Sequence, residues 1–151
     1  MARTMQNTVR IDAPPATVWA ILIDFDERPE WDPYYREVRG ELADGARLTV
    51  RASLNDKDRI VTSRPRIVAL EPGERLVWTN RFFVLGLLDS RQEFRLTSPK
   101  AGVTQLHQTE RFRGLLVTPL GGMLDDVEAR LRRWAVAIKQ RAEAREGRRS
   151  A

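Results

Sequence analysis

The sequence predicts a single α+β domain in which an antiparallel sheet of roughly seven strands wraps around a long C-terminal helix. Between residues 35 and 113, short segments of alternating apolar and polar residues are separated by polar turns. Alternation with a period of two is typical of half-buried strands. From Gly121 to about Ala144 the apolar residues instead recur every three or four positions, which predicts an amphipathic helix.

The chain length is that of one domain. Its 151 residues fit a single unit covering residues 1–151, since domains most often contain about 100–150 residues. No internal repeat marks a second unit. Chain ends are usually poorly ordered unless something holds them, so we expect residues 1–5 and 145–151 to be flexible.

The N-terminal part predicts one strand followed by two short helices. Residues 8–12 alternate apolar and polar side chains, and the prolines that follow end this strand. Pro15 suits the first turn of a helix that continues from about Ala16. Residues 26–33 are rich in turn-forming residues and fit one more helical turn. The apolar residues of the first helix are Val18, Trp19, Leu22 and Phe25.

The remaining strands follow one another with short turns between them, as in an antiparallel meander. The segment 60–70 contains Pro65, which cannot donate a hydrogen bond to a neighbouring strand. We therefore expect this segment at a sheet edge, or with a bulge at the proline. In chain order, the expected strands span residues 35–42, 48–54, 60–70, 75–81, 91–97 and 103–113.

The C-terminal helix presents one apolar stripe, because its apolar residues step by four and three positions. At 1.5 Å per residue, this helix would be on the order of 36 Å long. A helix this long cannot close along its whole length against a strongly bent sheet, and the gap between them is a natural cavity. The stripe consists of Leu120, Leu124, Val127, Leu131, Trp134 and Ile138.

The composition excludes several kinds of site. The chain has no cysteine and a single histidine, His107. Disulfides, thiolate metal sites and the usual zinc ligand sets are therefore excluded, and we expect neither a metal nor a cofactor. No segment approaches the roughly 20 apolar residues of a membrane span. We expect no integral membrane segment and a cytoplasmic protein.

The net charge of +5 raises the question of a nucleic-acid partner. Much of the excess lies in the C-terminal helix, where arginines are interleaved with glutamates. Mixed signs on a helix usually form a solvated surface. No aromatic-rich basic strand accompanies the charge, so we expect no nucleic-acid partner.

Four segments, in this order and spacing, resemble the START-like superfamily, often labelled SRPBCC or polyketide cyclase/dehydrase-like. They are residues 9–19, 24–33, 70–78 and 110–116. The resemblance implies a helix-grip fold, with the sheet wrapped around the last helix and a hydrophobic tunnel between them. Relatives bind lipids, sterols or polyketides, cyclise aromatic intermediates or bind partners, so the fold does not select one function. The family has no universal catalytic motif to transfer.

The residues expected to line the cavity lie on the inner faces of two strands and on the helix stripe. Trp78 resembles the family's cavity-side tryptophan, although simple core packing explains it equally well. On the strand of residues 103–113, the even positions carry the apolar residues and therefore face inward. The expected lining is Trp78, Asn80, Phe82, Leu106, Gln108, Glu110, Phe112, Leu124, Val127 and Leu131.

Glu110 is the candidate catalytic residue, because alternation directs it inward among apolar neighbours. Burial there would raise its pKa and suit it to acid–base chemistry or to holding a polar ligand group. The alternative is a structural carboxylate, either paired with an arginine such as Arg91 or Arg95 or lying near a water-filled cavity mouth. His107 lies on the opposite face of the same strand, where we expect it to point to solvent.

Residues 82–88 form an unusually apolar connection between two strands. It fits core packing around Gly86, a gate over the cavity mouth, a membrane-touching tip or a dimer contact. A homodimer through this segment stays an open alternative. The gate candidates are Phe83, Leu85, Leu87 and Leu88.

The function expected from these features is the binding of a small lipophilic or aromatic molecule in the internal cavity. Burial of apolar ligand surface would supply the affinity, and Asn80, Gln108 and Glu110 would orient a polar end. One alternative is a polyketide cyclase/dehydrase-type enzyme in which Glu110 moves a proton. Another is a protein-interaction module that uses residues 82–88.

Overall fold

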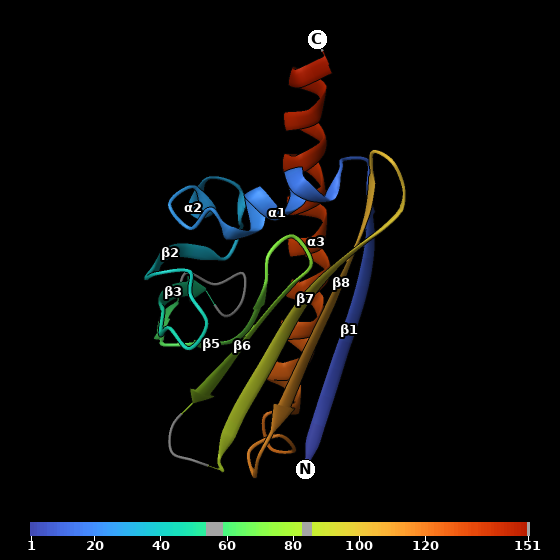
Figure 1. The fold of residues 1–151 in the computed structure, drawn as a ribbon. Helices are drawn as coiled ribbons and strands as arrows, with labels where there is room; N and C mark the ends of the chain where they lie inside the picture. The colour runs from blue at the N-terminus through green and yellow to red at the C-terminus, as the bar shows by residue number, and fades with distance from the viewer. Residues whose placement is uncertain (54–58, 83–85, 151) are drawn as a thin grey trace.

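The computed structural model of the chain describes residues 1–53, 59–82 and 86–150. In this part of the chain, eight strands and three helices follow the predicted order (Figure 1). The α+β class, with the sheet wrapped around the C-terminal helix, is confirmed. The elements are β1 (Ala2–Ile11), α1 (Pro15–Ile23), α2 (Arg28–Trp31), β2 (Tyr35–Arg39), β3 (Thr49–Ser53), β4 (Ile60–Ser63), β5 (Arg66–Glu71), β6 (Arg75–Phe82), β7 (Leu88–Lys100), β8 (Val103–Arg113) and α3 (Gly121–Ser150).

The strands form two antiparallel sheets, with the orders β1-β8-β7-β6-β5 and β2-β3-β4. Backbone hydrogen bonds from the segment before β3 join the two sheets. The backbone N–H of Gly45 donates to the carbonyl oxygen of Ile67, and that of Leu48 donates to Pro65, each at 2.8 Å. The helix α3 runs along the larger sheet, and α1 packs beside α3 (Figure 1). The two sheets and α3 therefore enclose one interior.

The strand count differs from the expected seven because the segment 60–70 is two strands. Pro65 separates β4 from β5, and the two belong to different sheets. Each of them is the last strand of its sheet, and residues 45–48 pair with part of the outer edge of β5. A proline that lacks the N–H donor is compatible with such a junction.

Both ends of the chain carry more regular structure than expected. The strand β1 begins at Ala2, which pairs with Arg113. The side chain of Met5, also on β1, is buried in the core. At the other end, α3 continues past the expected boundary near Ala144 to Ser150. The hydroxyl of Thr17 on α1 donates to Glu146 at 2.9 Å and ties the last turns of α3 to the body.

The core consists of two apolar clusters along α3. The larger one includes Trp134 and Ile138 and surrounds α1 and the upper part of the sheets. The smaller one lies near the start of α3, where Leu124, Val127 and Leu131 pack against β1, β7 and β8. The predicted apolar stripe of the helix is therefore its buried face.

A buried ion pair connects α2 to α3. The Arg28 side chain donates to Asp32 at 2.7 Å, and the two side chains are 1% and 0% exposed. Asp32 also accepts from the indole N–H of Trp134 at 2.8 Å and from the backbone N–H groups of Tyr34 and Tyr35 at 2.8 and 3.0 Å. The guanidinium of Arg28 lies 4.6 Å from the ring centroid of Tyr35. This network fixes the start of β2, and with it Tyr35.

Candidate functional site

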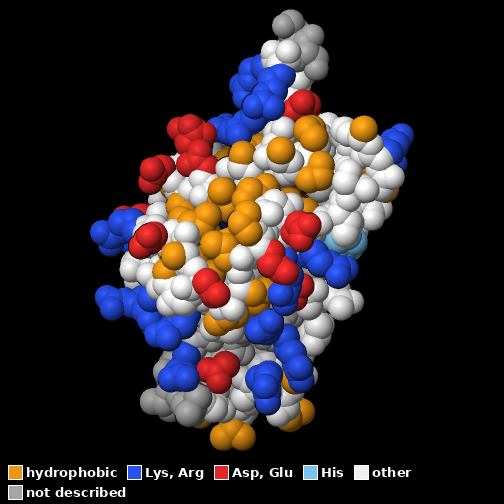
Figure 2. Space-filling view, viewed as in Figure 1, with side chains coloured by type: hydrophobic (Ala, Val, Ile, Leu, Met, Phe, Trp, Pro, Cys, Tyr) orange, Lys and Arg blue, Asp and Glu red, His pale blue; other side chains and the backbone are white. Residues whose placement is uncertain are grey.

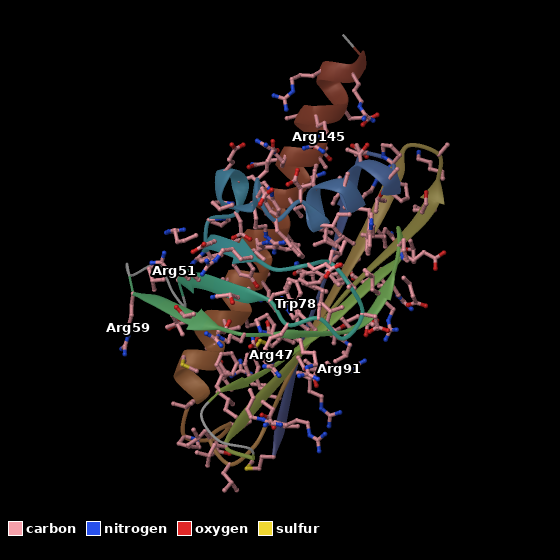
Figure 3. The ribbon with its side chains drawn as sticks, turned by 60° about the vertical axis from the view of Figure 1, so that its left-hand side comes forward. Arg47, Arg51, Arg59, Trp78, Arg91 and Arg145 are labelled. Carbon is pink, nitrogen blue, oxygen red and sulfur yellow. The ribbon has the colours of Figure 1, made fainter. Side chains whose placement is uncertain are left out.

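An internal cavity of about 50 Å³ lies between the two sheets and α3. The small sheet, the larger sheet and the helix all contribute to its wall, and Trp78 lies near the middle of the molecule (Figure 3). The wall carries one carboxylate and one guanidinium among apolar, amide and hydroxyl groups. The lining residues are Tyr35, Val50, Ala52, Val61, Ser63, Trp78, Asn80, Phe82, Ser90, Gln92, Glu110 and Arg130.

Four of the ten predicted lining residues border this cavity: Trp78, Asn80, Phe82 and Glu110. The others face inward but are packed. Leu106 belongs to the larger core cluster, and Gln108 is fully buried outside the cavity wall. The start of α3 packs on β1, and apolar side chains fill the space beneath it. The smaller core cluster takes up the remaining four, Phe112, Leu124, Val127 and Leu131.

Glu110 is the carboxylate of the cavity. No hydrogen bond or ion pair joins it to any of the described residues, and it is a half-buried residue of the cavity wall. Burial raises its pKa from 4.5 to about 7, and the charge of Arg130 opposes this shift only in part. The carboxyl group can therefore both release and accept a proton near neutral pH.

The pairing partners considered for Glu110 lie on the wrong side of the sheet. Glu110 is directly opposite Gln92 on β7, so Arg91 is one residue out of phase and faces the other way. Arg95 is out of phase for the same reason, and it lies opposite His107. The interpretation of Glu110 as a salt-bridged structural carboxylate is therefore not supported by the described contacts.

Besides Glu110, the cavity wall contains the guanidinium of Arg130 and the phenol of Tyr35. Arg130 donates to the carbonyl oxygen of Ser53 at 2.6 Å, and its guanidinium lies 5.1 Å from the ring centroid of Tyr34. Burial raises the pKa of Tyr35, while the charges of Arg28 and Arg130 act in the opposite direction. The Tyr35 hydroxyl therefore stays protonated and can donate a hydrogen bond to a ligand.

The sequence pattern indicates that Arg130 lies beside the buried face of the helix. For Tyr35, the pattern is misleading. Arg130 lies three residues after Val127 and four before Trp134, which places it beside the buried stripe. Tyr35 and Val38 are both buried although their spacing is not even. An irregularity in the register between Tyr35 and Glu37 breaks the alternation on which the prediction depends.

Several buried polar atoms near Glu110 have no hydrogen-bond partner within the described part of the chain. They include the Asn80 carbonyl oxygen and both amide atoms of Gln108. Gln108 is 1% exposed and lies two residues before Glu110 on the inner face of β8. Trp78, in contrast, is satisfied, because its indole N–H donates to Gln92 at 2.8 Å. Unpaired buried polar groups are costly and often mark a place where water or a ligand binds.

The sole histidine lies away from the cavity. His107 is within hydrogen-bond distance of the hydroxyls of Thr8 and Thr97, at 3.1 and 2.9 Å, on the outer face of β8. Its ring is thus occupied by neighbours on β1 and β7. The described residues hold no cluster of three or more His, Asp or Glu side chains suited to a metal ion.

The gate candidates divide into two groups. Phe83 and Leu85 lie outside the described residues. Leu88 is buried in the smaller core cluster, and the Leu87 carbonyl oxygen accepts the backbone N–H of Leu116 at 3.0 Å. Neither Leu87 nor Leu88 lines the cavity described above.

The family model for polyketide cyclase/dehydrase and lipid transport proteins matches residues 2–143. The chain belongs to this family. Among solved structures, the fold is similar to that of the Zhui aromatase/cyclase from Streptomyces sp. R1128, with a TM-score of 0.80 and 22% identity over 96% of each chain. A START superfamily protein from Mycobacterium smegmatis has a TM-score of 0.72 and 16% identity, covering 93% of this chain and 97% of that one.

A third similar structure, Ara h 8.0201, has a TM-score of 0.73 and 16% identity, covering 95% of this chain and 99% of the other. At these identities, the likeness establishes the shared helix-grip fold alone. None of the curated protein sequences matches this member of the family. None of its described helices is long and apolar enough to cross a membrane.

Proposed function

We propose that this protein binds a small aromatic or otherwise lipophilic ketone between the sheets and α3, and that Glu110 transfers protons on it, as in a cyclisation followed by dehydration. The observation that carries the proposal is the unpaired, desolvated carboxyl group, whose pKa of about 7 leaves both protonation states populated at neutral pH. Similarity to an aromatase/cyclase fold supports the reaction class.

In the dehydration step, the Glu110 carboxylate takes a proton from the carbon next to the ketone, which forms an enolate. The resulting carboxylic acid then gives its proton to a hydroxyl group on the neighbouring carbon. That C–O bond breaks, a C=C double bond forms and water leaves. The guanidinium of Arg130 and the hydroxyl of Tyr35 line the same cavity and would stabilise the negative oxygen of the enolate.

The size of the cavity limits how a substrate can enter. Pockets for drug-sized ligands measure about 300–1,000 Å³, whereas this cavity measures about 50 Å³. Binding therefore requires the wall to move outward. The small sheet forms one side of this wall, and the backbone bonds of residues 45–48 join it to β5.

A second candidate is binding without turnover, and the amide of Asn80 favours it. Asn80 lines the cavity, and its buried carbonyl oxygen, which has no described partner, would hold the polar end of a lipophilic molecule as well as it would hold a substrate. The two candidates differ in whether Glu110 is needed for anything beyond affinity.

The test uses 2-tetralone, a small bicyclic ketone whose protons next to the carbonyl exchange with solvent. Its binding is measured by quenching of tryptophan fluorescence, and its exchange in D₂O is followed by proton NMR. The wild-type protein should bind it and accelerate exchange at neutral pH, whereas Glu110→Gln should bind equally well and not accelerate exchange. Equal acceleration by both proteins would contradict the role of Glu110. Binding without any acceleration would favour the second candidate.

A further inference from the structure

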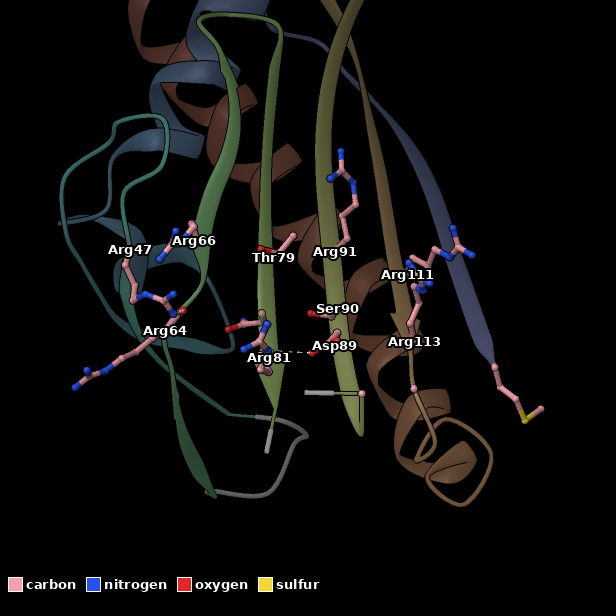
Figure 4. Close-up of a pocket in the computed structure, with 14 residues that line it drawn as sticks. Arg47, Arg64, Arg66, Thr79, Arg81, Asp89, Ser90, Arg91, Arg111 and Arg113 are labelled. Atoms are coloured by element: carbon pink, nitrogen blue, oxygen red, sulfur yellow. Dashed lines mark hydrogen bonds and ion pairs between the residues drawn. The ribbon is translucent and has the colours of Figure 1, made fainter. Parts of the chain in front are cut away.

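A second hollow lies mainly over the outer face of the larger sheet, and it shares Asn80 and Ser90 with the wall of the internal cavity. It has a volume of about 1,100 Å³ and crosses the outer faces of β5, β6, β7 and β8 (Figure 4). Arg47, Arg64 and Arg66 lie at one side of it, and Arg111 and Arg113 at the other. We refer to this hollow as the outer groove.

The outer groove is lined by seven arginines and a single acidic residue, Asp89. All seven arginines are exposed. In the view of Figure 2, Lys and Arg side chains gather over the lower half of the molecule with few acidic side chains among them. The outer groove is thus a local concentration of positive charge on strands, separate from the basic residues of α3.

The strand register sets the arginines side by side. Arg66 lies opposite Thr79, Thr79 opposite Arg91, and Arg91 opposite Arg111. Neighbouring strands are about 4.8 Å apart, so one row across four strands presents three guanidinium groups on one face. Arg81 and Arg113 belong to the next row, on either side of Asp89.

Most of these arginines have no anionic partner within the described part of the chain. Arg81 lies 3.7 Å from Asp89, and Arg47 donates to the backbone carbonyl of Arg64 at 3.1 Å. Several arginines elsewhere are paired with acids, for example Arg75 with Glu93 at 3.0 Å. Like charges directly opposite each other on a sheet are destabilising. The pair Arg91 and Arg111 therefore has a stability cost that an external anion would remove.

The residues that line the outer groove indicate which class of anion it would bind. No aromatic residue lines it, and apart from Met1, Gly86 and Gly114 its wall is polar. Protein interfaces depend on aromatic and apolar anchors, and sequence-tolerant single-strand binding depends on aromatic stacking. Both are missing here. Arginine in a concave site is best matched to phosphate, which it contacts through two parallel hydrogen bonds.

We propose that the outer groove is a second binding site, which takes an organic molecule carrying two or more phosphate groups. Phosphates of one ligand would contact Arg91 and Arg111, with Arg66 or Arg113 reaching a further phosphate. Glu110 does not line the outer groove, and phosphate binding there does not depend on the function proposed for the internal cavity.

The probe is inorganic tripolyphosphate, titrated into the full-length protein by isothermal calorimetry in 50 mM salt. The wild type should bind one equivalent, and orthophosphate should bind at least tenfold more weakly. The double variant Arg91→Gln/Arg111→Gln should lose at least tenfold in affinity, while its circular dichroism stays unchanged because both side chains are exposed.

The matched control is Arg148→Gln/Arg149→Gln, which removes the same charge from the exposed end of α3. It should bind like the wild type. Equal losses in both double variants, or binding that never saturates, would show a general charge effect and overturn the proposal. A thymidine oligonucleotide or an oligoglutamate of equal charge that binds more tightly than tripolyphosphate would overturn it in favour of a macromolecular partner.

Discussion

Glu110 on β8 and Arg130 on α3 line the same cavity, yet Arg130 donates its 2.6 Å hydrogen bond to the carbonyl oxygen of Ser53 and not to the carboxylate. Arg130 therefore lowers the pKa of Glu110 by its charge alone, which does not offset the effect of burial. A buried carboxyl group that is not paired keeps its proton to higher pH. This arrangement underlies the first two predictions.

Glu110→Gln should change how the stability of the protein depends on pH. Between about pH 4.5 and 7 the unfolded chain releases the Glu110 proton while the folded protein retains it, so the free energy of unfolding falls as the pH rises. The loss amounts to about 3 kcal/mol at most. Urea unfolding at pH 5 and pH 8 should show the wild type losing more stability than the variant over this interval. Equal losses would contradict a raised pKa.

Arg130→Met should raise the pKa of Glu110 further, because it removes the one positive charge that favours the carboxylate. We expect an upward shift of about one pH unit, measured by carbon NMR of the labelled glutamate carboxyl groups. Arg132→Met serves as the control, since Arg132 is an exposed residue that pairs with Glu128. A shift of the same size in the control would contradict a specific effect of Arg130.

Asp32→Ala should destabilise the protein by about 3–5 kcal/mol, as expected when one partner of a buried ion pair is removed. The substitution leaves the buried Arg28 charge and the Trp134 indole N–H without their acceptor. Urea unfolding measures the loss. Glu27→Ala removes an exposed partner of Arg141 and should cost less than about 1 kcal/mol. Similar costs for the two variants would contradict the central place of the Asp32 network.

Gly114→Ala should destabilise the protein by roughly 1–3 kcal/mol or more. Gly114 has a φ of +128°, and a Cβ atom there would lie 2.4 Å from the Leu87 carbonyl oxygen. Gly121→Ala, at the start of α3, meets open space and should be neutral or stabilising. Thermal unfolding compares the two. A tolerated Gly114→Ala would contradict the close packing of the β6–β7 connection against the segment after β8.

The fold was predictable because two periodicities dominate the sequence. The alternation of β8 and the three-and-four spacing of α3 both reflect burial against a single interior, and both are confirmed by the structure. Even so, the long segment 60–70 turned out to be two strands in separate sheets. A proline signals a break in pairing, but the sequence does not say where each half then finds its partner.

The candidate site was only partly predictable. Alternation places Glu110, Trp78 and Asn80 on inner faces, and the cavity includes all three. It does not reveal that the smaller core cluster fills the space beside the start of α3, which is a matter of side-chain packing. The outer groove was missed altogether, because Arg66, Arg91 and Arg111 come together only through the register of strands far apart in the sequence.

The most direct test of the account is the titration of Glu110 itself in the wild-type protein. Carbon NMR of a sample labelled at the glutamate side-chain carboxyl groups, with the resonance assigned by its absence from Glu110→Gln, gives the midpoint. A midpoint near pH 7 is the predicted result and would establish a group able to exchange protons at neutral pH. A midpoint near the ordinary glutamate value of about 4.3 would mean that the carboxylate is solvated or paired, and would contradict the proposed function.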